Sequence, residues 1–117
     1  PYLWDEVTVS VTYESDWKRA KKIMEDVATD IVGEKMRNAA RFLYESREYR
    51  LKFRDRHTVP HTYTVLAPSS IDLSVRYLVE ARNRRGVNTQ ITEAILEAFG
   101  KTKRIDIAYP HVEIVRK

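Results

Sequence analysis

The sequence predicts an α+β fold in which two helices cover one face of a four-stranded sheet. Two kinds of pattern favour this class. Apolar and polar residues alternate along two long runs, which is the period of a strand with one buried face. Two further runs place apolar residues three and four apart, as amphipathic helices do. The order strand, helix, strand, strand, helix, strand is the βαββαβ order of a ferredoxin-like sandwich.

The clearest strand covers residues 71–79. The residues that would face the core are all apolar: Ile71, Leu73, Val75, Tyr77 and Val79. The residues between them are polar except Leu78, so we expect a central strand with one buried face. A first strand is expected over residues 5–13, where valines alternate with threonine and serine, because β-branched residues suit a half-buried pleated surface.

A long first helix is expected after this strand. Ser15 or Asp16 offers a side-chain acceptor for the free amides of a helix N-terminus. An apolar stripe at helical spacing follows: Trp17, Ala20, Ile23, Met24, Val27, Ala28, Ile31, Met36, Ala39, Ala40, Leu43 and Tyr44. Good helix formers extend the helix to about Tyr49. Residues 49–53 also alternate, so the end of the segment 34–57 stays open between helix and strand.

The second half repeats the alternation of strand and helix. A short strand at 62–66 and a turn at 67–70 lead into the central strand as a hairpin. A second amphipathic helix is expected from Val87 to Phe99, and Gly100 is well placed to stop it. Ile105, Ile107 and Tyr109 then alternate in a fourth sheet strand, and 112–115 form a further extended piece after Pro110.

The composition describes one soluble domain over residues 1–117: a sandwich at 1–110, with an extended basic region at 34–57, and a C-terminal strand at 111–117. No apolar run approaches the roughly 20 residues needed to cross a bilayer, and no signal peptide is visible. The absence of cysteine excludes disulfides and thiolate chemistry, and fits a reducing compartment.

The excess positive charge is concentrated in the segment 34–57. It holds eight basic and four acidic residues, a surplus of four that equals the net charge of +4 of the whole chain. Such a run forms either a surface that faces anions or nucleic acid, or simply the solvated face of a helix, and the second is the commoner case.

No catalytic, cofactor or metal site is expected. His57 and His61 stand four apart, but Pro60 between them argues against a shared helical face, and His111 stands alone. Three scattered glycines make no phosphate loop. Asp5 and Glu6 are neighbours in a strand and point to opposite faces, so they cannot share a substrate. The chain is therefore expected not to be an enzyme.

Nucleic-acid binding is not expected either. Sheets of this topology bind RNA through exposed aromatic residues on two central strands, on which bases stack. Neither face of the two strongest predicted strands carries such a platform, and Asp72 would repel phosphate. A free-standing ferredoxin-like module that binds RNA or a small ligand is kept as the alternative function.

Several motifs resemble the C-terminal cytoplasmic domain of the small-conductance mechanosensitive channel family. Trp4-Asp5-Glu6-Val7 and Ser15-Asp16-Trp17 resemble its start. The central run 71–79 is similar to its middle strand, and the stretch from Ile91 to Tyr109-Pro110-His111 is similar to its closing helix and its aromatic-proline ending. The similarity runs from about Trp4 to Val115.

The resemblance implies a homoheptameric membrane channel that releases ions and small solutes under membrane tension after osmotic downshift. Membrane helices, the pore and a β-rich middle domain would precede this segment. Seven copies would form a hollow cage at the cytoplasmic face of the membrane, with side openings that pass solutes. The segment itself would contribute assembly and solute filtering. As an isolated fragment it would be compatible with a monomer, because a short terminal strand buries little area.

The resemblance also implies an oligomer interface at the C-terminus, where one strand of each subunit joins a small parallel barrel. The residues concerned are Pro110, His111, Val112, Glu113, Ile114 and Val115. The residues themselves agree in one respect: 112–115 lie beyond the predicted fourth strand and have no strand left to pair with inside the chain. The other interpretation of this piece is a frayed terminus.

A basic patch is hypothesised within the segment 34–57. It consists of Arg47, Arg50, Lys52 and Arg54. If these residues lined a side opening of the cage, they would favour the passage of anions. Replacing the three arginines by glutamate should then lower the anion-to-cation permeability of the parent channel, and an unchanged permeability ratio would count against the hypothesis.

Overall fold

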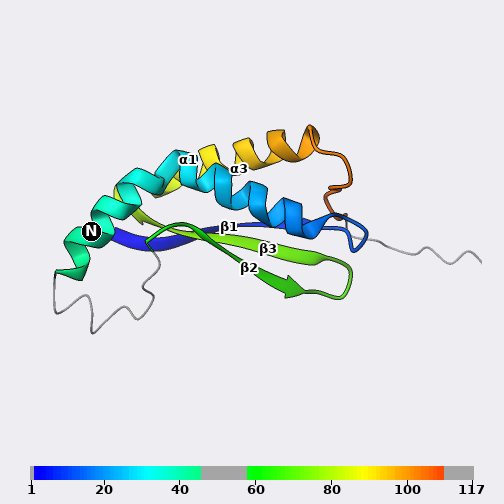
Figure 1. Cartoon of the computed structure of the whole chain (residues 1–117), viewed down its shortest axis with the longest axis horizontal. Coiled ribbons are helices and arrows are strands. Elements are labelled where there is room, and N and C mark those ends of the chain that lie inside the picture. Colours follow the sequence, from blue (N-terminus) through cyan, green and yellow to red (C-terminus); the bar gives the residue numbers. More distant parts are fainter. Residues whose placement is uncertain (1, 46–57, 110–117) are drawn as a thin grey trace, which may run out of the picture.

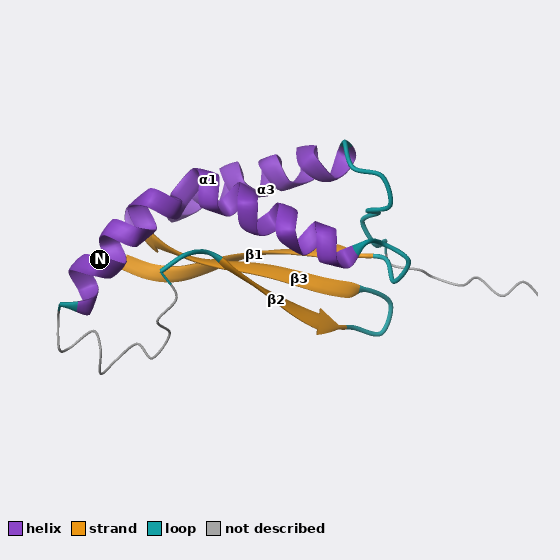
Figure 2. Cartoon of the chain, in the orientation of Figure 1, coloured by secondary structure: helices purple, strands orange, loops and turns teal. Residues whose placement is uncertain are grey.

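Two helices lie on the same face of a three-stranded antiparallel sheet (Figures 1 and 2). The computed structural model describes residues 2–45 and 58–109. The elements in chain order are β1 (Tyr2–Val11), α1 (Trp17–Tyr44), β2 (His61–Leu66), β3 (Ile71–Glu80), the short 3-10 helix η1 (Ala81–Asn83) and α3 (Arg84–Gly100).

β3 is the central strand, as the alternation in its sequence predicts, and the strand order is β1-β3-β2. β1 pairs with it over its full length, from Tyr2 opposite Glu80 to Val11 opposite Ile71. β2 pairs with its other edge and joins it through a tight turn, in which the Ala67 N–H donates to the Ser70 carbonyl at 2.9 Å.

The four-stranded ferredoxin-like sandwich predicted from the sequence is wrong. Residues 105–109 form no fourth strand; Ile107 makes one isolated antiparallel bridge to Val11, at the very end of β1. Two hydrogen bonds frame it: Thr12 N–H to the Asp106 carbonyl at 3.0 Å, and Ala108 N–H to the Ser10 carbonyl at 2.9 Å.

The helix α3 explains why the pairing along β1 stops there. In an antiparallel ladder every second residue directs its backbone groups to the same edge, so the Glu6 carbonyl lies on the same outer edge as that of Ser10. Asn88 of α3 donates its side-chain amide to the Glu6 carbonyl at 3.2 Å. A side chain of the helix therefore occupies the position that a fourth strand would need.

The helix α1 begins where the sequence predicts it. The Asp16 carboxylate accepts a hydrogen bond from the Arg19 N–H at 3.1 Å and so satisfies one free amide of the first turn. The side of the helix that faces the sheet repeats every four residues and is buried: Ala20, Met24, Ala28, Val32 and Met36. The helix ends at Tyr44, and the predicted continuation to Tyr49 lies outside the described residues.

The core fills the space between the sheet and the two helices. α3 contributes Ile91, Ile95 and Phe99 to it, one or two turns apart. The largest fully buried apolar and aromatic side chains come from both helices and from β1 and β3: Val11, Met24, Met36, Leu73, Val75, Tyr77, Ile91 and Ile95. Burial of apolar area of this kind is the main stabilising contribution in a domain of this size.

The opposite face of the sheet is rich in hydroxyl groups. The Thr8 and Ser74 hydroxyls lie 2.7 Å apart across β1 and β3. One Asp72 carboxylate oxygen accepts from the Ser10 hydroxyl at 2.6 Å and from the Ser70 hydroxyl at 2.8 Å. These hydrogen bonds, that of Ser10 first, lower the pKa of Asp72 because they stabilise its charged form.

β2 is a short edge strand with apolar side chains in solvent. The Thr62 N–H donates to the Glu25 carboxylate of α1 at 3.2 Å, which ties the start of the strand to the helix. Toward its end Val65 and Leu66 are exposed, Leu66 to 78%. Within the described residues no further strand lies along its outer edge. Val65 and Leu66 carry no charge that would protect such an edge from pairing.

Candidate functional site

The residues predicted from the sequence to be functional all lie outside the described part of the chain. This holds for the predicted interface of Pro110, His111, Val112, Glu113, Ile114 and Val115, and for the basic patch of Arg47, Arg50, Lys52 and Arg54. Both sets stay predictions. The last described residue before the interface is Tyr109, whose side chain is 76% exposed.

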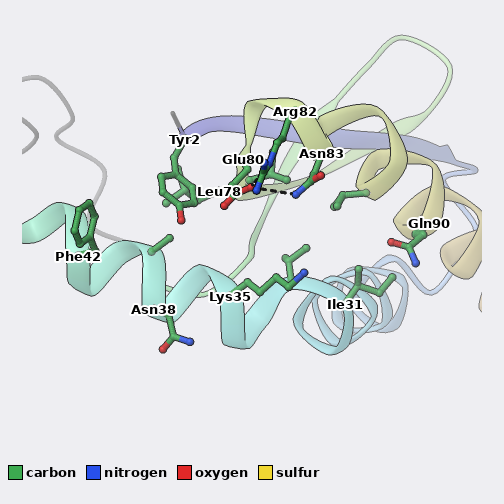
Figure 3. A pocket seen from close by; sticks show the side chains of 14 residues that line it. Tyr2, Ile31, Lys35, Asn38, Phe42, Leu78, Glu80, Arg82, Asn83 and Gln90 are labelled. Atoms are coloured by element: carbon green, nitrogen blue, oxygen red, sulfur yellow. Dashed lines mark hydrogen bonds and ion pairs between the residues drawn. The ribbon is translucent and has the colours of Figure 1, made fainter.

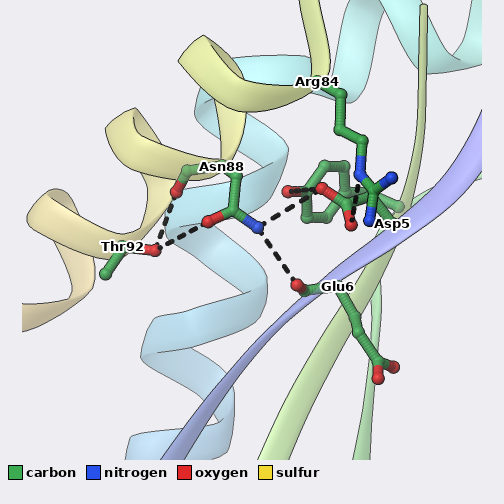
Figure 4. Close-up of polar contacts among 6 residues, drawn as sticks. Asp5, Glu6, Arg84, Asn88 and Thr92 are labelled. Atoms are coloured by element: carbon green, nitrogen blue, oxygen red, sulfur yellow. Dashed lines mark hydrogen bonds and ion pairs between the residues drawn. The ribbon is translucent and has the colours of Figure 1, made fainter. Parts of the chain in front are cut away.

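A polar cluster around a buried carboxylate stands out among the described residues, and we call Asp5, Tyr77, Arg84 and Asn88 the Asp5 cluster (Figure 4). The Asp5 side chain is only 7% exposed. Its Oδ2 accepts from the Tyr77 hydroxyl at 3.1 Å and from the Asn88 amide at 3.3 Å. Its Oδ1 accepts from Arg84 Nε at 3.3 Å.

The fold brings these four residues together from three elements. Asp5 and Tyr77 are directly opposite each other in β1 and β3. Arg84 and Asn88 are four residues apart in α3, so they occupy the same side of the helix. The Thr92 hydroxyl, one turn further, donates to the Asn88 carbonyl at 2.7 Å. The cluster therefore fixes the start of α3 on both strands.

The electrostatics of the Asp5 cluster favour a structural role. A buried carboxylate needs donors or a counter-charge, and Asp5 has both. Burial above all, and then the charge of Asp5 and the hydrogen bond to it, raise the pKa of Tyr77 well above its usual range. The phenol therefore stays protonated at neutral pH and acts as a donor, not as a base or nucleophile.

The raised pKa of Tyr77 makes the fold sensitive to alkali. In the unfolded chain the phenol ionises near pH 10, whereas the folded chain resists this ionisation, so its contribution to stability is complete below pH 10 and is lost as the pH rises further. Between pH 10 and 11 the free energy of unfolding should fall by about 1 kcal/mol more for the wild type than for Tyr77→Phe. Urea unfolding at both pH values measures this difference, and parallel falls in the two proteins would contradict it.

Among the hollows on the described part of the chain, two lie next to the elements discussed so far. One of about 490 Å³ lies beside the Asp5 cluster, where Arg82, Arg84 and Arg85 surround it. The other, of about 580 Å³, lies between the second half of α1 and the start of α3, at the end of the sheet where Tyr2 and Glu80 stand (Figure 3). We call this second hollow the α1–α3 groove.

The described residues contain no group of three or more histidine, aspartate or glutamate side chains that could hold a metal ion. None of the helices in this part of the chain combines the length and the apolar character that a bilayer span requires. Comparison with protein-family models and with curated proteins gave no match.

Sequence reasoning missed the Asp5 cluster and the α1–α3 groove. It did place Asp5 and Glu6 on opposite faces, and Asp5 is buried while Glu6 is exposed. The missed signal is that Asp5 shares the side of β1 that Val7, Val9 and Val11 turn toward the core. A carboxylate in an inward position must find donors. Which donors it finds depends on how α3 packs.

Proposed function

We propose that this chain is the cytoplasmic cage domain of a mechanosensitive channel of the small-conductance family. The resemblance of its motifs from Trp4 to Val115 is the basis of the proposal. The observation that supports it most is the exposure of Tyr109, a large aromatic side chain directly before the predicted interface strand 112–115. Aromatic residues are enriched where proteins associate, and a neighbouring subunit would cover this one.

In this role the domain performs no chemistry. Seven copies form the cage on the cytoplasmic side of the membrane, and the interface strand of each copy pairs with those of its neighbours. The cage holds the subunits together and filters the solutes that reach the pore. Tension sensing and gating belong to the membrane helices that the proposal places before this segment. Within the described residues no fourth strand pairs along β1, and the proposal assigns the strand 112–115 to pairing with other subunits.

The coding sequence upstream of Pro1 tests the proposal directly. We expect about three apolar segments of roughly 20 residues each, the last rich in glycine and alanine, followed by a middle domain. A start codon within a few residues of Pro1 would end the proposal. The free-standing ligand- or RNA-binding module would then be the function to test.

Assembly of the parent protein gives a second test. In the double variant Val112→Asp and Ile114→Asp, two charges replace apolar side chains on one side of the interface strand, and we expect the seven-fold ring to lose subunits in native mass spectrometry. The matched control is Glu113→Gln, which alters the same strand on its other side and should keep the ring. A ring that survives in the double variant would show that the strand does not hold the subunits together.

A further inference from the structure

The α1–α3 groove has the size of a ligand site. Its volume of about 580 Å³ falls within the range of roughly 300–1,000 Å³ that is typical of small-molecule pockets. Buried apolar side chains form part of its lining, among them Val32, Ala39 and Val79. The groove lies between the second half of α1 and the start of α3, over the end of the sheet at Tyr2 and Glu80 (Figure 3).

The groove has an aromatic end and a polar end (Figure 3). At the aromatic end Tyr2 points toward α1, and Phe42 stands on the rim with 71% of its surface exposed. At the polar end lie Lys35, Asn83 and Gln90. A molecule that filled the groove would therefore meet apolar surface at one end and hydrogen-bond donors at the other.

Among the described residues, the polar end carries a positive charge that no carboxylate pairs with. The Glu80 carboxylate at its edge accepts from Arg82 Nε at 3.0 Å and from the Asn83 amide at 3.2 Å, so its charge is already matched. The Lys35 ammonium has no such partner: among the described residues no carboxylate forms an ion pair with it. A ligand that complements this end of the groove therefore carries a negative charge.

We propose that the α1–α3 groove binds a small amphipathic carboxylate, with its anionic group at Lys35 and its apolar body toward Phe42. Two independent features select this ligand. The unmatched ammonium favours an anion, and an ammonium–carboxylate hydrogen bond is stronger than a neutral one. The exposed phenyl ring of Phe42 and the apolar lining favour a ligand with a hydrophobic chain or ring, since its binding removes that surface from water. This inference does not depend on the channel proposal.

Decanoate is a suitable probe, used below the concentration at which it forms micelles. In a titration of the 117-residue chain labelled with ¹⁵N, we expect saturable shifts of the amide resonances of Lys35, Ala39, Phe42 and Val87. The matched probe is decyltrimethylammonium, which has the same chain length and the opposite charge. Binding of the carboxylate alone supports the proposal, and equal binding of the two probes, or no saturable shift, would overturn it.

Three variants test whether the charges at the polar end of the groove determine the affinity for decanoate. Lys35→Gln removes the cation and should weaken decanoate binding about tenfold, which corresponds to the loss of one charge-assisted hydrogen bond. Glu80→Gln removes the negative charge that lines the groove and should strengthen binding about threefold. Lys103→Gln, an exposed lysine beyond the end of α3, is the matched control and should leave binding unchanged.

The signs of these effects decide the proposal. Unchanged affinity in Lys35→Gln would overturn it even if decanoate bound elsewhere on the chain. Shifts of the same amides on dilution of the chain without a ligand would identify a second copy as the occupant and would equally overturn it. Circular dichroism of each variant verifies that the fold is kept, which is expected because Lys35 and Lys103 are exposed and Glu80 is only partly buried.

Discussion

Asp5→Ala should destabilise the chain by roughly 3 kcal/mol, a large fraction of the total stability of a domain of this size. The substitution leaves the Tyr77 hydroxyl and the Asn88 side-chain amide without their acceptor in a largely buried site. Arg84 suffers less, since its side chain is mostly exposed and can return to water. Urea unfolding measures the change, and the midpoint should fall with little change in slope.

Glu6→Ala is the control for Asp5→Ala. Glu6 is the next residue of β1, carries the same charge and is exposed, so its replacement should change the free energy of unfolding by less than about 0.5 kcal/mol. A double-mutant cycle of Asp5→Ala with Tyr77→Phe isolates the contact between these two residues. Equal effects of Asp5→Ala and Glu6→Ala would mean that the Asp5 cluster does not hold α3 on the sheet.

Ile95→Ala should destabilise the chain by about 3 kcal/mol, because it removes a fully buried side chain and leaves a cavity between α3 and the sheet. Leu96→Ala is a matched control on the neighbouring position. The Leu96 side chain is 45% exposed, so its truncation should cost less than about 1 kcal/mol.

The comparison of Ile95 and Leu96 tests which side of α3 faces the core. Thermal unfolding followed by circular dichroism measures both variants, and a 1 kcal/mol change in a domain of this length shifts the midpoint by several degrees. If Leu96→Ala lowered the midpoint as much as Ile95→Ala, α3 would be rotated from the orientation described, or Leu96 would be covered in an assembly.

The strands β1 and β3 could be predicted because each has one face in the core and the other away from it. Burial on one face imposes a two-residue period that the sequence must carry, and Leu73 and Val75 in β3 follow it as closely as Val7 and Val9 in β1. The first turn of α1 could be predicted for a similarly local reason, since Asp16 caps it with its own side chain.

The fourth strand could not be judged from its own residues. Ile105 and Ile107 alternate correctly, and Ile105 is buried. A strand also needs a free edge to pair with, however, and Asn88 of α3 already bonds to the outer edge of β1. The contact between Asn88 and Glu6 joins residues far apart in the chain, so no local sequence pattern predicts it. The start of α3 at Arg84 was missed for a related reason: Asn83 makes no side-chain cap, and η1 leads directly into the helix.

The candidate sites depended even more on tertiary structure. The Asp5 cluster requires a strand pair and one side of a helix to meet. The α1–α3 groove arises from the space between two helices. The local sequence around Lys35 and Phe42 is that of any amphipathic helix, so it gives no sign that these residues line a groove. The sequence alone shows only that a carboxylate, Asp5, stands in the row of β1 residues that faces the core.

Within residues 2–45 and 58–109 no strand pairs with the outer edge of β2, and this edge links the expected solubility of the chain to ionic strength. Chains with a net charge of +4 repel one another at low ionic strength. This repulsion opposes the association of two chains through their β2 edges. At about 0.1 M salt the repulsion reaches only about 10 Å. The attraction between exposed Val65 and Leu66 side chains of two chains is apolar and short-ranged, so salt does not weaken it. We therefore expect any self-association through β2 to increase with salt, whereas a dimer that dissociates when salt is added must be held together by another surface.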